Sequence, residues 1–229
     1  MSHLHAIVEA IRNELEVKER LRDETLHRAR QLTRYCANAI RAVHRGDKAE
    51  AEQLLQAARA AAQEMRGEIA HHPDLYYAGY TQDALKELSE AHLAYALITD
   101  QAIPTPQALG VEPPAYLNGL AEAMGELRRY VLDRLRQDDI ATGERLLDIM
   151  DEVYTLLITL DFSEAVTGGL RRNTDAVRAV LERTRGDLTV AVRQEALKVA
   201  LREFGVRSGV SSSTEIAHSV SGTAETETL

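Results

Sequence analysis

Residues that break helices are sparse in this chain, and their positions constrain the fold more than any other feature. The 229 residues include five prolines and thirteen glycines. Between these breakers, apolar residues recur three and four positions apart, and no segment shows the alternation of a strand. The pattern predicts six long helices, near residues 3–45, 47–71, 74–100, 113–136, 139–162 and 169–204. Because the links between them are short, we expect antiparallel neighbours in an all-α, single-domain bundle.

Composition and charge limit the class of protein without naming a function. Hydrophobic residues make up 45% and charged residues 28% of the chain, as in an ordinary water-soluble protein. The net charge of −9 argues at first against nucleic acid, although whole-chain charge says little about one face. The single cysteine, Cys36, excludes an internal disulfide, and its place in a helical pattern favours a buried thiol over a nucleophile.

The sequence gives no sign of export or membrane insertion. Glu9 and Arg12 interrupt any apolar run near the start, so a signal peptide is not expected. No stretch approaches the roughly 20 apolar residues that a membrane-spanning helix needs. We therefore expect a cytoplasmic protein without membrane contact.

The last part of the chain differs from the rest in composition. Residues 206–229 contain six serines and four threonines and few large apolar side chains. Such a segment buries too little apolar surface to offset the entropy lost on ordering. The sequence therefore predicts a helical domain over residues 1–205 and a disordered Ser/Thr-rich tail over residues 206–229.

A basic stripe lies along the first predicted helix. Residues 26–46 hold five arginines and no acidic residue, although the protein as a whole is acidic. At about 100° per residue, four of these arginines fall within about 60° of one another on the helix surface. They are Arg30, Arg34, Arg41 and Arg45. Arginines at helical spacing can grip successive phosphates. The alternative is a solvated face, or one that pairs with acids of neighbouring helices.

Two pairs of glutamates stand at helical spacing on the third and fourth long helices. Glu87 and Glu90 are three residues apart, and Glu122 and Glu126 are four apart, so each pair projects from one helix face. If the two helices pack side by side, four carboxylates converge and need a cation, for which Mg²⁺ or Mn²⁺ is suited. Both pairs also lie opposite the apolar stripes of their helices, so two unrelated surface pairs are the alternative.

Two segments resemble the translin family. Residues 169–189, Gly-Leu-Arg-Arg-Asn-Thr-Asp-Ala-Val-Arg-Ala-Val-Leu-Glu-Arg-Thr-Arg-Gly-Asp-Leu-Thr, are similar to the last-helix signature of its prokaryotic members. Residues 116–129 resemble the family segment that opens with Tyr-Leu-x-Gly and closes with Glu-Leu-x-Arg. The resemblance covers roughly residues 10 to 204. It implies an all-helical protomer that assembles with copies of itself into a closed, hollow shell and binds RNA or single-stranded DNA.

The resemblance also implies a site. In the nuclease branch of the family, that of translin-associated factor X, the acids form a Glu-x-x-Glu pair and an Asp-x-x-x-Glu pair. Glu87 and Glu90 match the first pair, Glu126 matches the end of the second, and Glu122 stands where the family has aspartate. The extra methylene moves the oxygens by roughly 1.5 Å, which is expected to weaken activity or to alter the metal preference. In the family the first helices contribute positive residues to the inner surface, so the resemblance implies that the stripe residues contact RNA: Arg30, Arg34, Arg41 and Arg45.

Three functions are consistent with these features. The first is a Mg²⁺- or Mn²⁺-dependent endoribonuclease for single-stranded RNA, with Glu87, Glu90, Glu122 and Glu126 as metal ligands and catalytic groups. The second is a protein that binds RNA or single-stranded DNA on the same basic face without cutting it. The third is a purely structural helical scaffold, which leaves the glutamate pairs unexplained.

Overall fold

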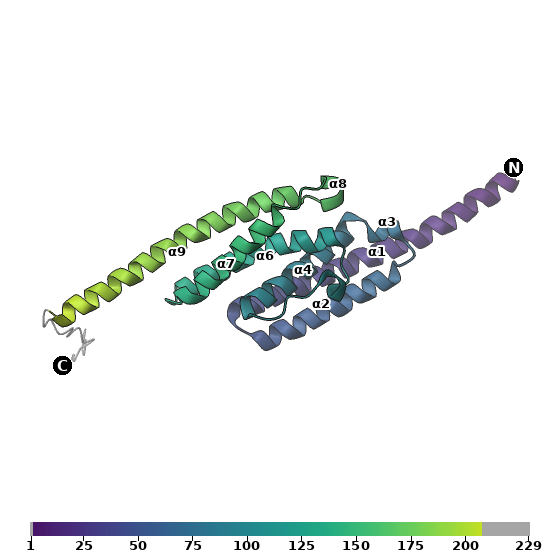
Figure 1. Cartoon of the computed structure of the whole chain (residues 1–229). Coiled ribbons are helices and arrows are strands. Elements are labelled where there is room, and N and C mark those ends of the chain that lie inside the picture. The colour runs from purple at the N-terminus through teal and green to yellow at the C-terminus, as the bar shows by residue number, and fades with distance from the viewer. Residues whose placement is uncertain (1, 208–229) are drawn as a thin grey trace, which may run out of the picture. The chain divides into compact units, whose positions relative to one another are not determined.

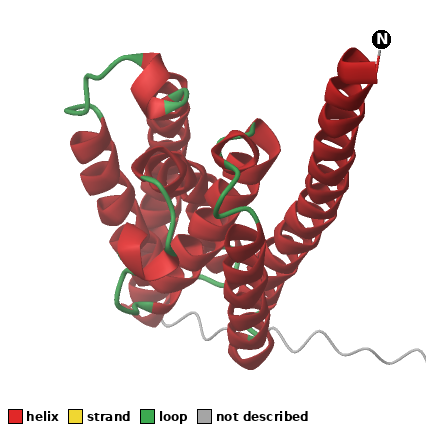
Figure 2. Cartoon of the chain, turned by 90° about the vertical axis from the view of Figure 1, so that its right-hand side faces the viewer, coloured by secondary structure: helices red, strands yellow, loops and turns green. Residues whose placement is uncertain are grey.

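Helices make up every regular element of residues 2–207, the part of the chain that the computed structural model describes (Figures 1 and 2). The all-α prediction is confirmed, and each of the six predicted regions contains one long helix. These are α1 (Ser2–Arg45), α2 (Lys48–Glu68), α4 (Gly79–Thr99), α6 (Pro113–Leu135), α7 (Ile140–Leu157) and α9 (Leu170–Arg207). Three single turns lie between them: α3 (Pro73–Tyr76), α5 (Pro106–Leu109) and α8 (Glu164–Thr167).

Internal contacts group the chain into two compact units. The first unit is residues 1–189, and it holds all the glutamates and arginines considered below. The second begins at Val190, and its described part is the end of α9. The predicted tail lies outside the described residues from 208 onward. No helix of the described chain combines the length and apolar character that crossing a membrane requires.

The helix boundaries follow the local signals in the sequence. Asp47 begins α2 by accepting a hydrogen bond from the Glu50 backbone N–H at 3.0 Å, directly after Gly46, whose φ is +79°. Asp139 begins α7 in the same way, accepting from the Thr142 backbone N–H at 3.2 Å. Each carboxylate satisfies an N–H group that a first helical turn leaves without a partner, and glycine adopts positive φ without strain.

The predicted helix over residues 74–100 is two helices, because the chain turns after Tyr76. Thr81 Oγ1 donates to the Leu75 carbonyl at 2.8 Å, and Gln82 Nε2 donates to the Tyr76 carbonyl at 2.8 Å. These side chains satisfy carbonyls at the end of α3, so the backbone is extended at Ala78 before α4 begins. The predicted helices over 47–71 and 139–162 are shorter than expected and end at Glu68 and Leu157.

Helix α4 is central to the first unit, where it packs against α1, α2 and α6. One buried cluster joins α4 to α1 and α2 through side chains that include Leu32, Cys36, Leu55 and Leu88. A second joins α4 to α6, α7 and the start of α9. Cys36 is buried, as the sequence predicted. Because α4 has neighbours on several sides, its charged residues Lys86, Glu87 and Glu90 are half-buried.

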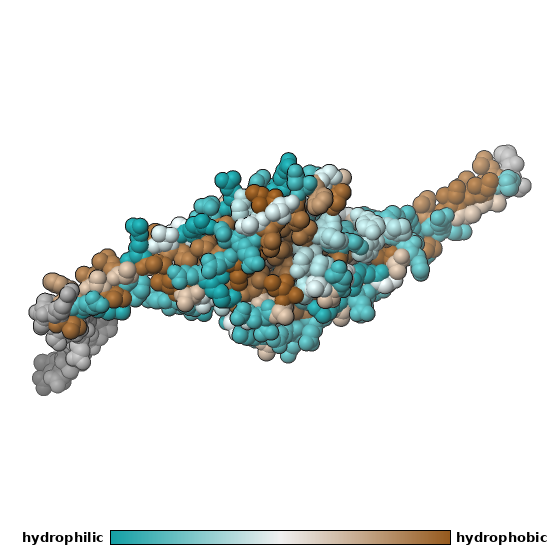
Figure 3. Space-filling model, viewed as in Figure 1, coloured by the Kyte–Doolittle hydropathy of each residue, from teal (hydrophilic) through white to brown (hydrophobic). Residues whose placement is uncertain are grey.

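The first turns of α1 leave apolar side chains uncovered. Leu4, Ile7, Ile11 and Leu15 are between 44% and 67% exposed, and they recur three and four residues apart. Figure 3 shows brown, hydrophobic atoms gathered along this end of α1. This stripe lies on the N-terminal part of α1, before the part of the helix that packs against α2 and α4.

Helices α4 and α6 approach each other closely at Gly119. A Cβ atom at this position would lie 2.7 Å from the Lys86 carbonyl oxygen, 2.7 Å from Ser89 Cβ and 2.9 Å from the Glu90 nitrogen. Such distances are shorter than van der Waals contact, and two of the three atoms belong to the backbone. The helices can therefore reach this separation only with glycine at 119.

We expect Gly119→Ala to destabilise the fold by about 1–3 kcal/mol, because the added methyl group forces α4 and α6 apart. Gly125→Ala, on the same helix, is the control: nothing lies within 4 Å of its added Cβ. That control should be neutral or stabilising by about 0.5–1 kcal/mol. Urea unfolding followed by circular dichroism measures both values, and equal stabilities of the two variants would contradict the close approach.

Candidate metal centre and nucleic-acid interface

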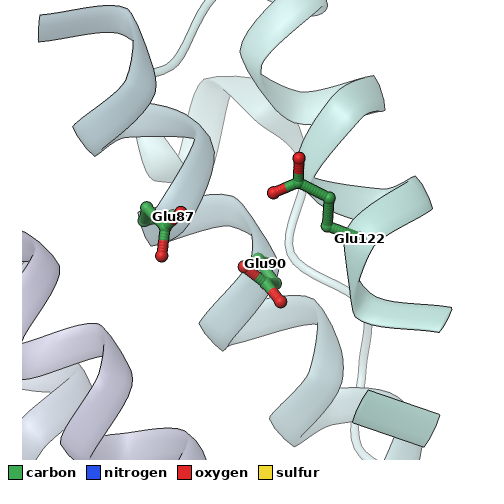
Figure 4. Close-up of side chains that lie close together, drawn as sticks. All are labelled: Glu87, Glu90 and Glu122. Atoms are coloured by element: carbon green, nitrogen blue, oxygen red, sulfur yellow. The ribbon is translucent and has the colours of Figure 1, made fainter. Parts of the chain in front are cut away.

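Three glutamates from two neighbouring helices converge in the first unit. Glu87 and Glu90 come from α4 and Glu122 comes from α6, and Figure 4 shows Glu122 reaching toward α4, where the other two lie on one side of the helix. One oxygen of each lies within 4.8 Å of the other two. The pairs are therefore neighbours, and the alternative of two unrelated surface pairs does not describe this arrangement. Gly119, one turn before Glu122, allows the helices to bring them together.

The fourth predicted glutamate, Glu126, has a different partner. His44 of α1 donates from Nε2 to Glu126 Oε2 at 2.5 Å, and the histidine side chain is only 5% exposed. Arg129 lies 3.8 Å from the same oxygen. The hydrogen bond from His44 lowers the pKa of Glu126 below its ordinary value. Glu126 is therefore a carboxylate at neutral pH, one helical turn beyond the three converging oxygens.

A lysine lies among the converging acids. Lys86 Nζ is 2.6 Å from one oxygen of Glu122 and 2.7 Å from the other, and 3.7 Å from Glu87 Oε1. Burial acts to lower the pKa of Lys86, but the hydrogen bond and charge of Glu122 outweigh it, and the pKa is raised. The ammonium group is therefore charged and neutralises part of the acidic cluster.

Glu90 has the least favourable surroundings for a negative charge. Burial raises its pKa to about 8, and the charges of Glu87, Glu122 and Glu126 act in the same direction. Burial also raises the pKa of Glu87, against the opposing effect of Lys86. At neutral pH the Glu90 carboxyl therefore holds a proton unless another cation is close by.

This donor set fits a hard divalent cation. It offers three carboxylate oxygens within 4.8 Å of one another, and burial, together with their mutual repulsion, keeps one of them protonated. A stand-in positive charge, the Lys86 ammonium, already occupies part of the space. Glu122 reaches the cluster although its side chain is one methylene longer than the aspartate that the family resemblance leads one to expect.

Sequence reasoning did not single out Lys86 or His44. Lys86 is adjacent to Glu87, but a lysine next to a glutamate is common on helix surfaces and carries no signal. His44 is 82 residues from Glu126 in the chain. Only the packing of α1 against the seam of α4 and α6 brings the two together, so no spacing in the sequence indicates this contact.

A cavity of about 530 Å³ adjoins the acidic cluster. Lys86 and Glu122 form part of its wall, and Arg172 and Asn173 at the start of α9 line it as well. Asn118 fixes that wall, because its Nδ2 donates to the carbonyls of Pro114 and Thr167, each at 2.8 Å. The space beside the acids is thus lined by polar and charged groups of both signs.

The four arginines of the predicted basic stripe are all exposed on α1. Arg41 donates to Asn38 Oδ1 at 2.7 Å, and Arg45 pairs with Glu50 of α2. Arg30 and Arg34 lie farther along the same face. Because Arg41 is three residues before His44, it is next to the residue that contacts Glu126. Arg41 and Arg45 of the stripe thus flank His44 along α1.

Comparison with known proteins identifies the family. The chain is 32% identical over 196 residues to an uncharacterized protein of Methanocaldococcus jannaschii, which covers 85% of this chain and 86% of that protein. The structure of AfC3PO in complex with duplex RNA matches 82% of this chain and 97% of its own, with 33% identity and a TM-score of 0.76. The chain belongs to the translin family.

Two further comparisons complete this assignment. A second crystal structure of AfC3PO gives 32% identity and a TM-score of 0.75 over the same shares of the two chains. Apo-NeC3PO has the same fold at 21% identity, with a TM-score of 0.74 over 80% of this chain and 96% of its own. No family model matches the sequence. The resemblance that the motifs predicted is confirmed.

The pKa of Glu90 leads to a test of the metal-free protein. Folding raises the pKa of Glu90 from 4.5 to about 8, so the folded protein holds this proton more tightly than the unfolded chain does. The resulting contribution to the free energy of unfolding is fully present below about pH 4.5 and is lost as the pH rises through about 8. Glu90→Gln, which stays neutral, should lack this loss. In EDTA at pH 8.5 we expect its free energy of unfolding to exceed that of the natural protein by at least about 1 kcal/mol, since one pKa unit corresponds to about 1.4 kcal/mol.

Urea titrations at pH 5 and pH 8.5 check this expectation. Glu144→Gln, at an exposed position of α7, serves as the control and should keep the pH dependence of the natural protein. An identical pH dependence in Glu90→Gln and Glu144→Gln would show that Glu90 does not carry the effect.

Proposed function

We propose that this chain binds RNA and cleaves it with the help of a bound divalent cation, Mg²⁺ or Mn²⁺. The observation that carries the proposal is the convergence of the Glu87, Glu90 and Glu122 oxygens within 4.8 Å, from two helices held together at Gly119. A purely structural protein has no use for a partly buried group of like charges, which costs stability. Membership of the translin family supports the same conclusion.

The proposed roles follow from the surroundings of each acid. Glu87, Glu90 and Glu122 would hold the cation. When bound, such a cation lowers the pKa of a water molecule and offsets the charge that develops on a phosphate. Glu126 is kept ionised by His44, next to the three ligands, and we assign it the role of orienting the attacking water.

The arginine stripe would hold the substrate backbone. Arg30, Arg34 and Arg41 are exposed guanidinium groups on one face of α1, and Arg41 is the nearest of them in the chain to His44. AfC3PO, which is similar to this chain, has been observed in a complex with duplex RNA. We therefore propose RNA as the substrate class. We expect cleavage of single-stranded RNA, and duplex RNA belongs in the same assays.

We also propose that the chain works as a homo-oligomer. The uncovered apolar stripe of Leu4, Ile7, Ile11 and Leu15 on α1 favours contact with another surface, since such continuous apolar faces are unfavourable in water. A shell formed by several copies would also enclose the sites and restrict entry to flexible strands.

A second function is favoured by a specific pair of contacts. Lys86 covers both oxygens of Glu122, and His44 holds Glu126. A site whose acids already have such partners can be stable without metal, and the protein would then bind RNA or single-stranded DNA without cutting it. Cleavage assays separate the two functions.

The nuclease proposal predicts cleavage of a fluorescent single-stranded RNA in Mg²⁺ or Mn²⁺ and none in EDTA. Glu87→Gln keeps the shape of the side chain but removes a charged ligand, so we expect at least a hundredfold slower cleavage. Glu144→Gln should cleave as the natural protein does. Binding of the RNA without cleavage in either metal would rule out the nuclease in favour of the second function.

The stripe predicts a salt dependence that is measurable without cleavage, in EDTA. Arg30→Ala combined with Arg34→Ala should weaken binding of a single-stranded RNA and lower the slope of log affinity against log salt by about 1.4, or about 0.7 for each lost phosphate contact. Arg136→Ala with Arg171→Ala removes the same charge from exposed positions elsewhere. An equal change in both double variants would show that the binding face is not on α1.

A further inference from the structure

Lys86 is the residue of the site whose position the proposed metal chemistry does not explain. Its Nζ atom contacts both oxygens of Glu122, at 2.6 and 2.7 Å, so this carboxylate is fully engaged by one ammonium group. Glu122 is also one of the three acids whose oxygens lie within 4.8 Å of one another. The lysine and a metal ion therefore compete for the same ligand.

Charge and geometry decide that competition. A divalent cation held by Glu87, Glu90 and Glu122 brings two positive charges into the space that Lys86 Nζ borders. Carboxylate oxygens are strong ligands for a hard divalent cation, whereas the ammonium group is a single charge on a flexible stem of four carbons. Repulsion between the two cations then favours movement of the lysine, whose stem can swing without any change in the backbone.

The displaced side chain has a place to go. Lys86 lines the 530 Å³ cavity beside the acids, and Arg172 lines another part of its wall. In the cavity a freed ammonium group lies next to the metal ligands and shares the space with a second cation. Two positive groups beside a metal centre are suited to a phosphate oxygen, which is the group that RNA presents to a nuclease.

We propose that Lys86 is an internal counter-ion that a divalent cation displaces from Glu122, and that the released lysine then holds the phosphate of the RNA substrate in the adjoining cavity. The proposal rests on the proposed metal-dependent function and assigns this lysine its part in it. Metal-free protein is kept stable by the ion pair, and metal binding converts the same side chain into a substrate-binding group.

Chemical labelling of lysines tests the displacement directly in the natural protein. The chain has four lysines, at positions 18, 48, 86 and 198, so mass spectrometry can follow each one. An amine-reactive ester should modify Lys86 slowly in EDTA, because its side chain is 22% exposed and paired. With Mg²⁺ at the same pH, we expect the rate at Lys86 to rise several-fold.

Two other lysines act as internal controls. Lys18 pairs with Asp74 and not with the clustered glutamates, and Lys48 is exposed. The rates at both should be the same with and without Mg²⁺. If the protein binds Mg²⁺ but the rate at Lys86 does not change, the displacement is overturned while the metal site stands. If calorimetry detects no Mg²⁺ or Mn²⁺ binding by the natural protein, the proposed function fails first.

Lys86→Met separates competition from substrate binding. Without the competing ammonium group, the dissociation constant for Mn²⁺ should fall by roughly tenfold. At saturating metal, however, RNA cleavage should slow by about a hundredfold, because the phosphate loses its ligand. Lys86→Arg, which keeps the charge, should restore part of the rate, and Lys18→Met should leave both quantities unchanged.

The opposite signs of the two effects are decisive. Tighter metal binding together with undiminished cleavage would show that Lys86 only repels the metal, which overturns its role toward the substrate. Unchanged Mn²⁺ affinity in Lys86→Met would overturn the competition for Glu122.

Discussion

The close contact of α4 with α6 at Gly119 is the constraint on which the candidate site depends. At this point a side chain of any size would collide with the backbone of Lys86 and Glu90. The glycine thus sets the distance between two helices that each carry a pair of glutamates. The resulting separation lets Glu122 of α6 join Glu87 and Glu90 of α4, so a packing detail in the core determines whether the acids form a cluster.

The cluster is unfavourable in itself, and its surroundings only partly offset this cost. Lys86 neutralises Glu122, and His44 stabilises the charge of Glu126, while Glu90 is left with a pKa of about 8. Burial of the two apolar clusters must therefore offset the repulsion between these like charges. Active sites commonly carry such strain because the groups that destabilise the free protein are those that bind a cation or a substrate.

Glu122 stands where the resemblance led us to expect aspartate. The longer side chain still brings its oxygens within 4.8 Å of those of Glu87 and Glu90, and both oxygens contact Lys86. The length of the Glu122 side chain therefore allows it to contact Lys86 and to approach Glu87 and Glu90 as well. His44 ties the same region to α1, and the exposed Arg41 and Arg45 flank it along that helix.

The sequence by itself determined the helical class, the six long helices and the family. Apolar spacing and capping residues act over a few positions, so they are visible as local sequence patterns. It also determined which glutamates share a helix face, and it indicated the basic stripe. Tertiary structure alone decided that the two pairs meet, that Glu126 pairs with His44 across 82 positions, and that Lys86 covers Glu122. Those contacts depend on the distance and rotation of whole helices, which are set by the packing of many side chains at once and leave no pattern along the chain.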